Sequence, residues 1–277
     1  MNKILILLLI TILPIAVIAE PKTDDMVNLS MQHRINGNDF LPKETLSLSS
    51  KKLKSDPSLL LQFVRNSLSN HLHTLPVQIS TNLEFSDKLP TIVIETKVDK
   101  NSNGVSDVTI PAYQISKDKI LVNWKGISSH LTFTGNFINL KADTNFDGIT
   151  ITGKDKLLIS LAKIDIHSAF DTKFKPTKLK IDLPSFKAQE DKNELNMQSF
   201  MTNIDVKKLT NGLEIINLAI QLKHINFVES DIKAGLKNLR LTTDIQEHDD
   251  VISFNLETTA DKVNLPTDIA TGLENIT

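Results

Sequence analysis

The residue types that most often carry chemistry are present in this chain, but their spacing forms no local catalytic motif. The sequence contains no Gly-x-Ser-x-Gly, no His-Glu-x-x-His, no phosphate-binding loop and no Gly-x-Gly-x-x-Gly. A catalytic triad is assembled in space, so spacing along the chain does not reveal one. We therefore predict a protein that is not an enzyme, and we assign it no catalytic, cofactor-binding or metal-binding residue.

Histidines supply the first candidates for metal binding. His71 and His73 end a predicted helix, where residues two apart point in divergent directions. We interpret them as cationic or hydrogen-bonding groups at the negative end of that helix. His130, His167 and His224 each stand singly within a predicted strand, without a second ligand at a motif spacing. The sequence thus predicts neither a metal ion nor a cofactor.

The segment from Asp99 to Asp107 allows two interpretations. Oxygen-bearing side chains at its positions 1, 3, 5 and 9, with glycine at position 6, are similar to half of a calcium-binding loop. Ile110, however, stands where such a loop needs a bidentate glutamate, and no helix is predicted beside it. Asn103-Gly104 is also a strong hairpin signal. We favour a plain hairpin turn, with calcium binding as the alternative.

The elements that must position these residues are mainly strands. Apolar and polar residues alternate with a period of two through residues 119–227, which predicts a sheet with one dry and one wet face. A sheet of about ten or more strands twists and curls. We predict a mainly β fold, one long curled antiparallel sheet built as a meander of hairpins. Residues expected in its core include Leu131, Phe133, Ile149, Ile151, Leu179, Ile181, Leu183 and the only tryptophan, Trp124.

One amphipathic helix is predicted over residues 57–73. Ser55-Asp56-Pro57 offers a capping side chain followed by proline at the first helical position. Apolar residues then recur at helical spacing from Leu59 to Leu72, and Pro76 ends the pattern. We expect this helix to pack on the dry face of the sheet.

The N-terminus is typical of a secretory signal peptide. Lys3 precedes an aliphatic run that Pro14 interrupts, and Val17-Ile18-Ala19 offers a cleavage site after Ala19. The alternative is an uncleaved inner-membrane anchor over residues 4–19, although a run of that length is short for a bilayer. We therefore predict a signal peptide (residues 1–19), a polar lead-in (20–54) and a β-rich domain (55–277), exported to the periplasm.

Composition narrows the possible partners. The chain has no cysteine, so its fold uses no disulfide and it carries no lipoprotein anchor. Its net charge is −2, and arginine is scarce among its 31 basic residues. Arginine is the residue best suited to planar phosphate recognition, so we expect no nucleic-acid surface.

Residues 76–260 resemble the YdgA-like family of uncharacterised Gram-negative envelope proteins. The segments that carry the resemblance are ILVNWKGISSHLTFTGNF, FDGITITGKD, ISLAKIDIHSAF, LNMQSFMTNIDV and IINLAIQLKHINF. The resemblance implies a periplasm-facing protein with an extended sheet, and it carries over no site residue. The chain departs from the family in that members usually continue beyond this C-terminus and commonly keep a longer membrane anchor.

Two functions follow from a large sheet with a dry face. The first is a non-enzymatic factor of the cell envelope, active in interaction or maintenance, whose dry face is filled by its own side chains. The alternative is a carrier that holds a lipid or an acyl chain against that face. The expected partner is thus an envelope protein or a lipid, and no oligomeric state is favoured.

Overall fold

The computed structural model describes residues 26–55, 58–85, 90–117, 119–135, 138–154, 156–172, 175–208, 212, 214–229, 232–248 and 251–264. The predicted signal peptide and its cleavage site lie outside these residues. The fold is mainly β, with one large antiparallel sheet, as the alternation predicts. The chain divides into two compact units, which are described separately.

Unit 1 comprises Met1–Tyr113, Gly126–Phe146 and Ser168–Pro176. Its strands pair antiparallel in the order β2–β1–β3–β4–β5–β8–β9. Their bounds are β1 Met26–Ile35, β2 Glu44–Ser49, β3 Val77–Phe85, β4 Ile92–Val98, β5 Asn103–Ile110, β8 Ile127–Thr134 and β9 Ile138–Phe146. β12 (Ile164–Phe170), of which only residues 168–170 belong to unit 1, pairs with β9.

The segment 20–54, expected as a polar lead-in with one short strand near residues 44–48, contributes two strands and most of a short helix to unit 1. β1 lies between β2 and β3, and its Leu29 and Met31 are buried. These residues form a strand because every second position of β1 faces the core, while the polar residues between them face away from it. The helix that follows, α3, spans Ser50–Ser55.

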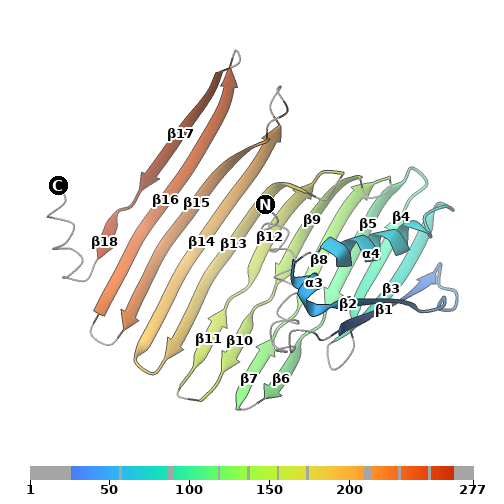
Figure 1. Ribbon diagram of the computed structural model, residues 1–277, viewed down its shortest axis with the longest axis horizontal. Helices are drawn as coiled ribbons and strands as arrows, with labels where there is room; N and C mark the ends of the chain where they lie inside the picture. Colours follow the sequence, from blue (N-terminus) through green and yellow to red (C-terminus); the bar gives the residue numbers. More distant parts are fainter. Residues whose placement is uncertain are drawn as a thin grey trace. The chain divides into compact units, whose positions relative to one another are not determined.

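Helix α4 spans Ser58–Ser69 and lies across the strands of unit 1 in Figure 1. Leu68 packs with Ile79, Phe133 and other apolar residues of the sheet, so the predicted packing of an amphipathic helix on the dry face is confirmed. The helix ends earlier than position 73. Backbone bonds from His71 to Leu68 and from Leu72 to Ser69 span three residues and tighten the end of the helix into a turn.

The turn between β4 and β5 lies before Asn103-Gly104, the dipeptide that signals the hairpin in the sequence. Ser102 has a φ of 62°, whereas Gly104 pairs with Val98 as part of β5. Glycine is required there because Phe133, its partner on β8, covers it: a Cβ on Gly104 would lie 2.1 Å from the ring. The glycine therefore serves close packing rather than turn geometry.

The sheet departs from a simple meander where β5 pairs with β8. Residues 114–125 between them belong to unit 2. Ile110 and Ile127 are the first pair on the return, next to Gly126 with a φ of 110°. Only glycine adopts that conformation readily, and a Cβ there would also press on the Ile110 carbonyl at 3.1 Å.

Unit 2 comprises Gln114–Lys125, Asp147–His167 and Thr177–Thr277. Its strands pair antiparallel in the order β7–β10–β11–β13–β14–β15–β16–β17, and β18 pairs with the start of β16. Their bounds are β7 Ile120–Trp124, β10 Ile149–Thr152, β11 Leu158–Leu161, β13 Pro176–Glu190, β14 Asn193–Lys208, β15 Glu214–Glu229, β16 Ile232–His248, β17 Val251–Thr259 and β18 Lys262–Asn264. β6 (Tyr113–Lys117) begins at the boundary between the units.

Most residues that the alternation assigns to the core are inside. Trp124 is fully buried opposite Ile149, and Phe133 and Ile181 are buried. Leu131, Ile149 and Ile151 are only half-buried. Among the described residues, no helix combines the length and the apolar character needed to cross a bilayer.

Candidate functional site

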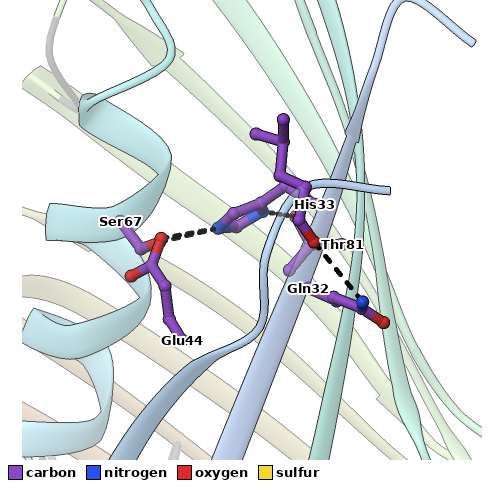
Figure 2. A network of polar contacts seen from close by, with 6 residues as sticks. Gln32, His33, Glu44, Ser67 and Thr81 are labelled. Atoms are coloured by element: carbon purple, nitrogen blue, oxygen red, sulfur yellow. Dashed lines mark hydrogen bonds and ion pairs between the residues drawn. The ribbon is translucent and has the colours of Figure 1, made fainter. Parts of the chain in front are cut away.

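A buried polar cluster lies between β1, β3 and helix α4 in unit 1. The His33 ring lies 2.8 Å from Thr81 Oγ1 through Nδ1 and 2.6 Å from Ser67 Oγ through Nε2 (Figure 2). Ser67 in turn donates a hydrogen bond of 2.7 Å to Glu44 Oε1. His33, Thr81 and Ser67 are all nearly inaccessible to water. Four side chains from separate segments thus form one continuous hydrogen-bonded chain.

Register and helical spacing place these side chains together. His33 on β1 is directly opposite Thr81 on β3, so both project from the same face of the sheet. Ser67 lies seven residues after Leu60 on the helix, within the stripe that faces the sheet. The cluster is therefore a polar insertion in the packed interface between helix and sheet.

The hydrogen-bonding capacity of each group determines which atoms of the cluster carry the protons. A carboxylate only accepts, so Ser67 gives its proton to Glu44 and its oxygen accepts from His33 Nε2–H. The other nitrogen, Nδ1, is then the acceptor for the Thr81 hydroxyl. Burial, together with the nearby His71, lowers the pKa of His33 from 6.5 to about 4, against the opposing effect of Glu44. His33 is consequently neutral near pH 7.

This arrangement differs from a nucleophile and its base. Catalytic serines pass their proton to a histidine, whereas Ser67 directs its proton to Glu44. Ser67 is 2 % exposed and Thr81 0 % exposed, so neither hydroxyl is presented to a substrate. The cluster as it stands favours a structural or ligand-binding role.

His71 brings a second imidazole to the cluster. Its ring lies 5.0 Å from that of His33, edge to face. One ligand atom from each of His33, Glu44 and His71 lies within 4.8 Å of the others. His71 Nε2 is buried and has no hydrogen-bond partner among the residues that the structure describes. The sequence prediction placed His71 at a helix end and assigned it no role of this kind.

The other histidines singled out from the sequence are not brought together. His73 and His167 are exposed, and His224 is half-buried within β15. His130 lies opposite Asp107 across β5 and β8, with 2.7 Å between Nδ1 and Oδ1 on an exposed surface. Spacing along the chain did not reveal this contact between His130 and Asp107, because the two residues are 23 positions apart.

The carboxylate of Asp99 organises its own turn. It accepts hydrogen bonds from the backbone N–H groups of Asn101 and Asn103 and from the Asn103 side chain. The bonds from Asn103 are the main reason that the pKa of Asp99 is lowered. These contacts describe the hairpin turn that the sequence favours over a calcium loop.

A second candidate site is the amphipathic sheet of unit 2. Directly paired residues of an antiparallel sheet share a face, and here one face collects apolar residues across five strands. We call this the apolar face; its residues are Leu179, Ile181, Leu183, Phe200, Thr202, Ile204, Val206, Ile216, Leu218, Ile220, Leu222, Leu239, Leu241, Thr243, Ile245, Phe254, Leu256 and Thr258. The opposite face pairs polar residues such as Lys178 with Asp205 and Gln221 with Arg240.

Exposure of the apolar face rises from β13 to β17. Leu179 and Ile181 on β13 are 4 % and 7 % exposed, whereas Phe254 and Leu256 on β17 are 62 % and 55 % exposed. The strands between them are mostly half-buried. The helices that the structure describes, α3 and α4, both belong to unit 1.

Comparisons with protein-family models, with curated proteins and with solved structures return no match for this chain.

Proposed function

We propose that this protein is an exported, non-enzymatic factor of the cell envelope that carries a lipid by holding its acyl chains against the apolar face. The observation that carries the proposal is the exposure gradient on that face, from buried on β13 to largely exposed on β17. Large exposed apolar patches on soluble domains are typical of binding surfaces.

The chemistry of the apolar face suits aliphatic chains. Its residues are mostly leucine and isoleucine, with phenylalanine at only two positions, Phe200 and Phe254. Each methylene that leaves water contributes about 0.8 kcal/mol, so a chain of about ten buried methylenes gains roughly 8 kcal/mol before the entropy cost of binding. Such a gain supports reversible carriage without any polar contact to the headgroup.

The location is proposed from the N-terminal sequence. A segment with the anatomy of a signal peptide precedes the strands, and the likeness to YdgA-like proteins favours the periplasm. The inner-membrane alternative, with residues 4–19 as an anchor, leaves the apolar face on the same side of the membrane. Both locations give the protein access to membrane lipids.

The test is to purify the mature chain from membranes without denaturant and to analyse it by native mass spectrometry. We expect a mature N-terminus at Glu20 and extractable lipid in substoichiometric to equimolar amount. Leu241→Asp should reduce the bound lipid severalfold, because Leu241 lies on the apolar face. The matched control is Thr242→Asp, the next residue, which projects from the opposite face. Lipid-free wild type, or equal lipid in both variants, would overturn the proposal.

A second candidate, a protein–protein interaction factor, is favoured by β17 itself. All nine residues of this strand are exposed, and within the described residues it pairs with β16 alone. An exposed edge strand can accept a strand from a partner by main-chain hydrogen bonds. A photo-crosslinking residue at Ser253 should then trap one discrete envelope protein, while the same residue at exposed Lys97 on β4 should not.

A further inference from the structure

We propose that His33, Glu44 and His71 form a binding site for a divalent transition-metal ion, with Zn²⁺ as the ion that the donor set suits best. The site would hold the ion through two imidazole nitrogens and one carboxylate oxygen, which is the ligand set of many three-ligand zinc sites. It lies in unit 1, and the argument for it is independent of lipid binding in unit 2.

The donor atoms are near the required separation. Ligands about 2.0–2.2 Å from a tetrahedral Zn²⁺ are roughly 3.4 Å apart. His33 Nε2 and Glu44 Oε1 are already 3.9 Å apart, and all three donor atoms lie within 4.8 Å of one another. The distances between the donor atoms must still shorten on metal binding, and Glu44 and His71, which are more accessible than His33, are the residues that would move. The Glu44 side chain is 40 % exposed, and His71 lies in the turn that follows helix α4.

Two independent features point to a ligand at this position. The first is the buried Nε2 of His71, which has no hydrogen-bond partner among the described residues. A buried nitrogen without a partner is costly, and coordination would satisfy it. The second is Thr81, which contacts Nδ1 of His33. An acceptor for the outer N–H of a ligating histidine fixes the ring and directs its other nitrogen to the metal. The Thr81 hydroxyl donates to Nδ1 in the hydrogen-bonded state and can equally accept from it.

Binding exchanges one set of contacts for another. In the hydrogen-bonded state, Ser67 Oγ bridges the His33 ring and the Glu44 carboxylate. When the metal binds, His33 turns its Nε2 lone pair to the ion and its proton moves to Nδ1, where it is donated to Thr81. The serine proton no longer reaches the carboxylate, which then coordinates. His33 itself releases no proton on binding near pH 7, because it is neutral in both states.

The donor chemistry selects the class of ion. Imidazole nitrogens suit Zn²⁺, Co²⁺, Ni²⁺ and Cu²⁺, whereas Ca²⁺ and Mg²⁺ require sets of oxygen ligands. Three protein ligands leave a fourth position for water. His33 itself is 1 % exposed, so the ion would enter from the side of Glu44.

The test uses the full mature chain, without an affinity tag and after treatment with EDTA. We expect one equivalent of Zn²⁺ to bind in calorimetry with a Kd of roughly micromolar or tighter, and to raise Tm. Co²⁺ alone should produce the intense visible absorption of a tetrahedral site. Glu44→Gln and His71→Ala should each weaken Zn²⁺ binding by at least about tenfold. His73→Ala is the matched control, because His73 is exposed two residues away and should bind as wild type does.

Several outcomes would overturn the site. They are a wild-type Kd for Zn²⁺ above about 1 mM, wild-type affinity in both ligand variants, or an equal loss in the His73→Ala control. Calcium raising Tm as much as Zn²⁺ does would also contradict it. His33→Ala is left out of the test because loss of this buried ring removes packing as well as a ligand. Circular dichroism of the two chosen variants checks that they fold.

Discussion

The two units contain the same kind of sheet and cover it differently. In unit 1, helix α4 packs on the dry face, and residues there such as Ile79 and Leu68 are 0 % and 2 % exposed. Unit 2 contains no helix among its described residues, and its apolar face is exposed on β17. Alternation thus specifies which side of a strand is dry, but it does not specify what keeps that side dry.

The difference extends to polar residues. Because unit 1 closes its core, it can bury His33, Thr81, Thr96 and Ser106 on the dry face, and each of them has a hydrogen-bond partner there. Such groups are tolerated in a core only when they are paired. The apolar face of unit 2 is mainly aliphatic, with threonine as its only polar residue type (Thr202, Thr243 and Thr258), which suits an apolar ligand better than a polar network would.

The largest expected effect compares one charge placed in each unit. Ile79→Asp places a carboxylate at a fully buried position in unit 1, which should cost several kcal/mol and unfold that unit. Ile220→Asp, on a half-buried strand of unit 2, should cost roughly 1 kcal/mol, because water reaches the new group. Hydrogen exchange followed by mass spectrometry measures each unit separately. Equal loss of protection in the two variants would show that the apolar face is closed.

The next effect is a dependence on pH that arises in unit 1 alone. Unfolded His33 titrates near 6.5 and folded His33 near 4, so between these values the unfolded state binds the extra proton. Stability is therefore complete above pH 6.5 and falls as pH drops to about 4, by up to about 3 kcal/mol. Glu44 and His71 are the titratable groups that face the ring.

This dependence is measured by urea unfolding in EDTA, comparing wild type with His33→Gln. The difference between the two proteins isolates His33 from carboxylates such as Glu84, whose pKa is lowered mainly by its hydrogen bond from Lys43. In the His33→Gln variant, the free energy of unfolding should no longer show the change between pH 4 and pH 6.5 that is due to His33. Parallel curves for the two proteins would be inconsistent with a buried neutral His33.

A smaller effect is expected where packing in unit 1 leaves no space. Gly104→Ala places a methyl group 2.1 Å from the Phe133 ring, which should cost roughly 1–3 kcal/mol through overpacking. Combining it with Phe133→Leu should recover part of that loss, so a thermal-melting double-mutant cycle gives a coupling energy. Gly153→Ala in unit 2 is the control, since its Cβ would lie no closer than 3.1 Å to any atom, that atom being the end of the Leu157 side chain, with Ile120 at 3.7 Å. Additive effects would contradict the proposed contact.

Local pattern was sufficient to predict the sheet and the helix. The alternation through residues 119–227 gave the strands, and the apolar stripe after Pro57 gave α4. β1 was missed because polar residues are as numerous in it as apolar ones, although Leu29 and Met31 with Ile35 keep the period of two. His33 occupies a position in that period where an apolar residue is expected, and this is the one signal that marked it.

The site around His33 could not be predicted from the sequence, because strand pairing and helix packing bring together residues that are far apart in the chain. His33 and Thr81 are 48 residues apart, and Ser67 and Glu44 are 23 residues apart. Their proximity depends on how β1 pairs with β3 and on how α4 packs over both. The division into two units was likewise unpredicted, since the excursion of residues 114–125 between β5 and β8 interrupts no hydrophobic pattern.

The strand order from β13 to β17 would allow the sheet to become wider or narrower by the gain or loss of whole strands. Each of these strands pairs with its neighbours in the sequence, so every hairpin contacts only the hairpins beside it, as repeats do in a solenoid. Adding or removing one strand at β17 would change the span of the apolar face by about 4.8 Å and leave the remaining registers intact. Duplication or loss of single hairpins is therefore a route by which descendants of this chain could accommodate larger or smaller ligands.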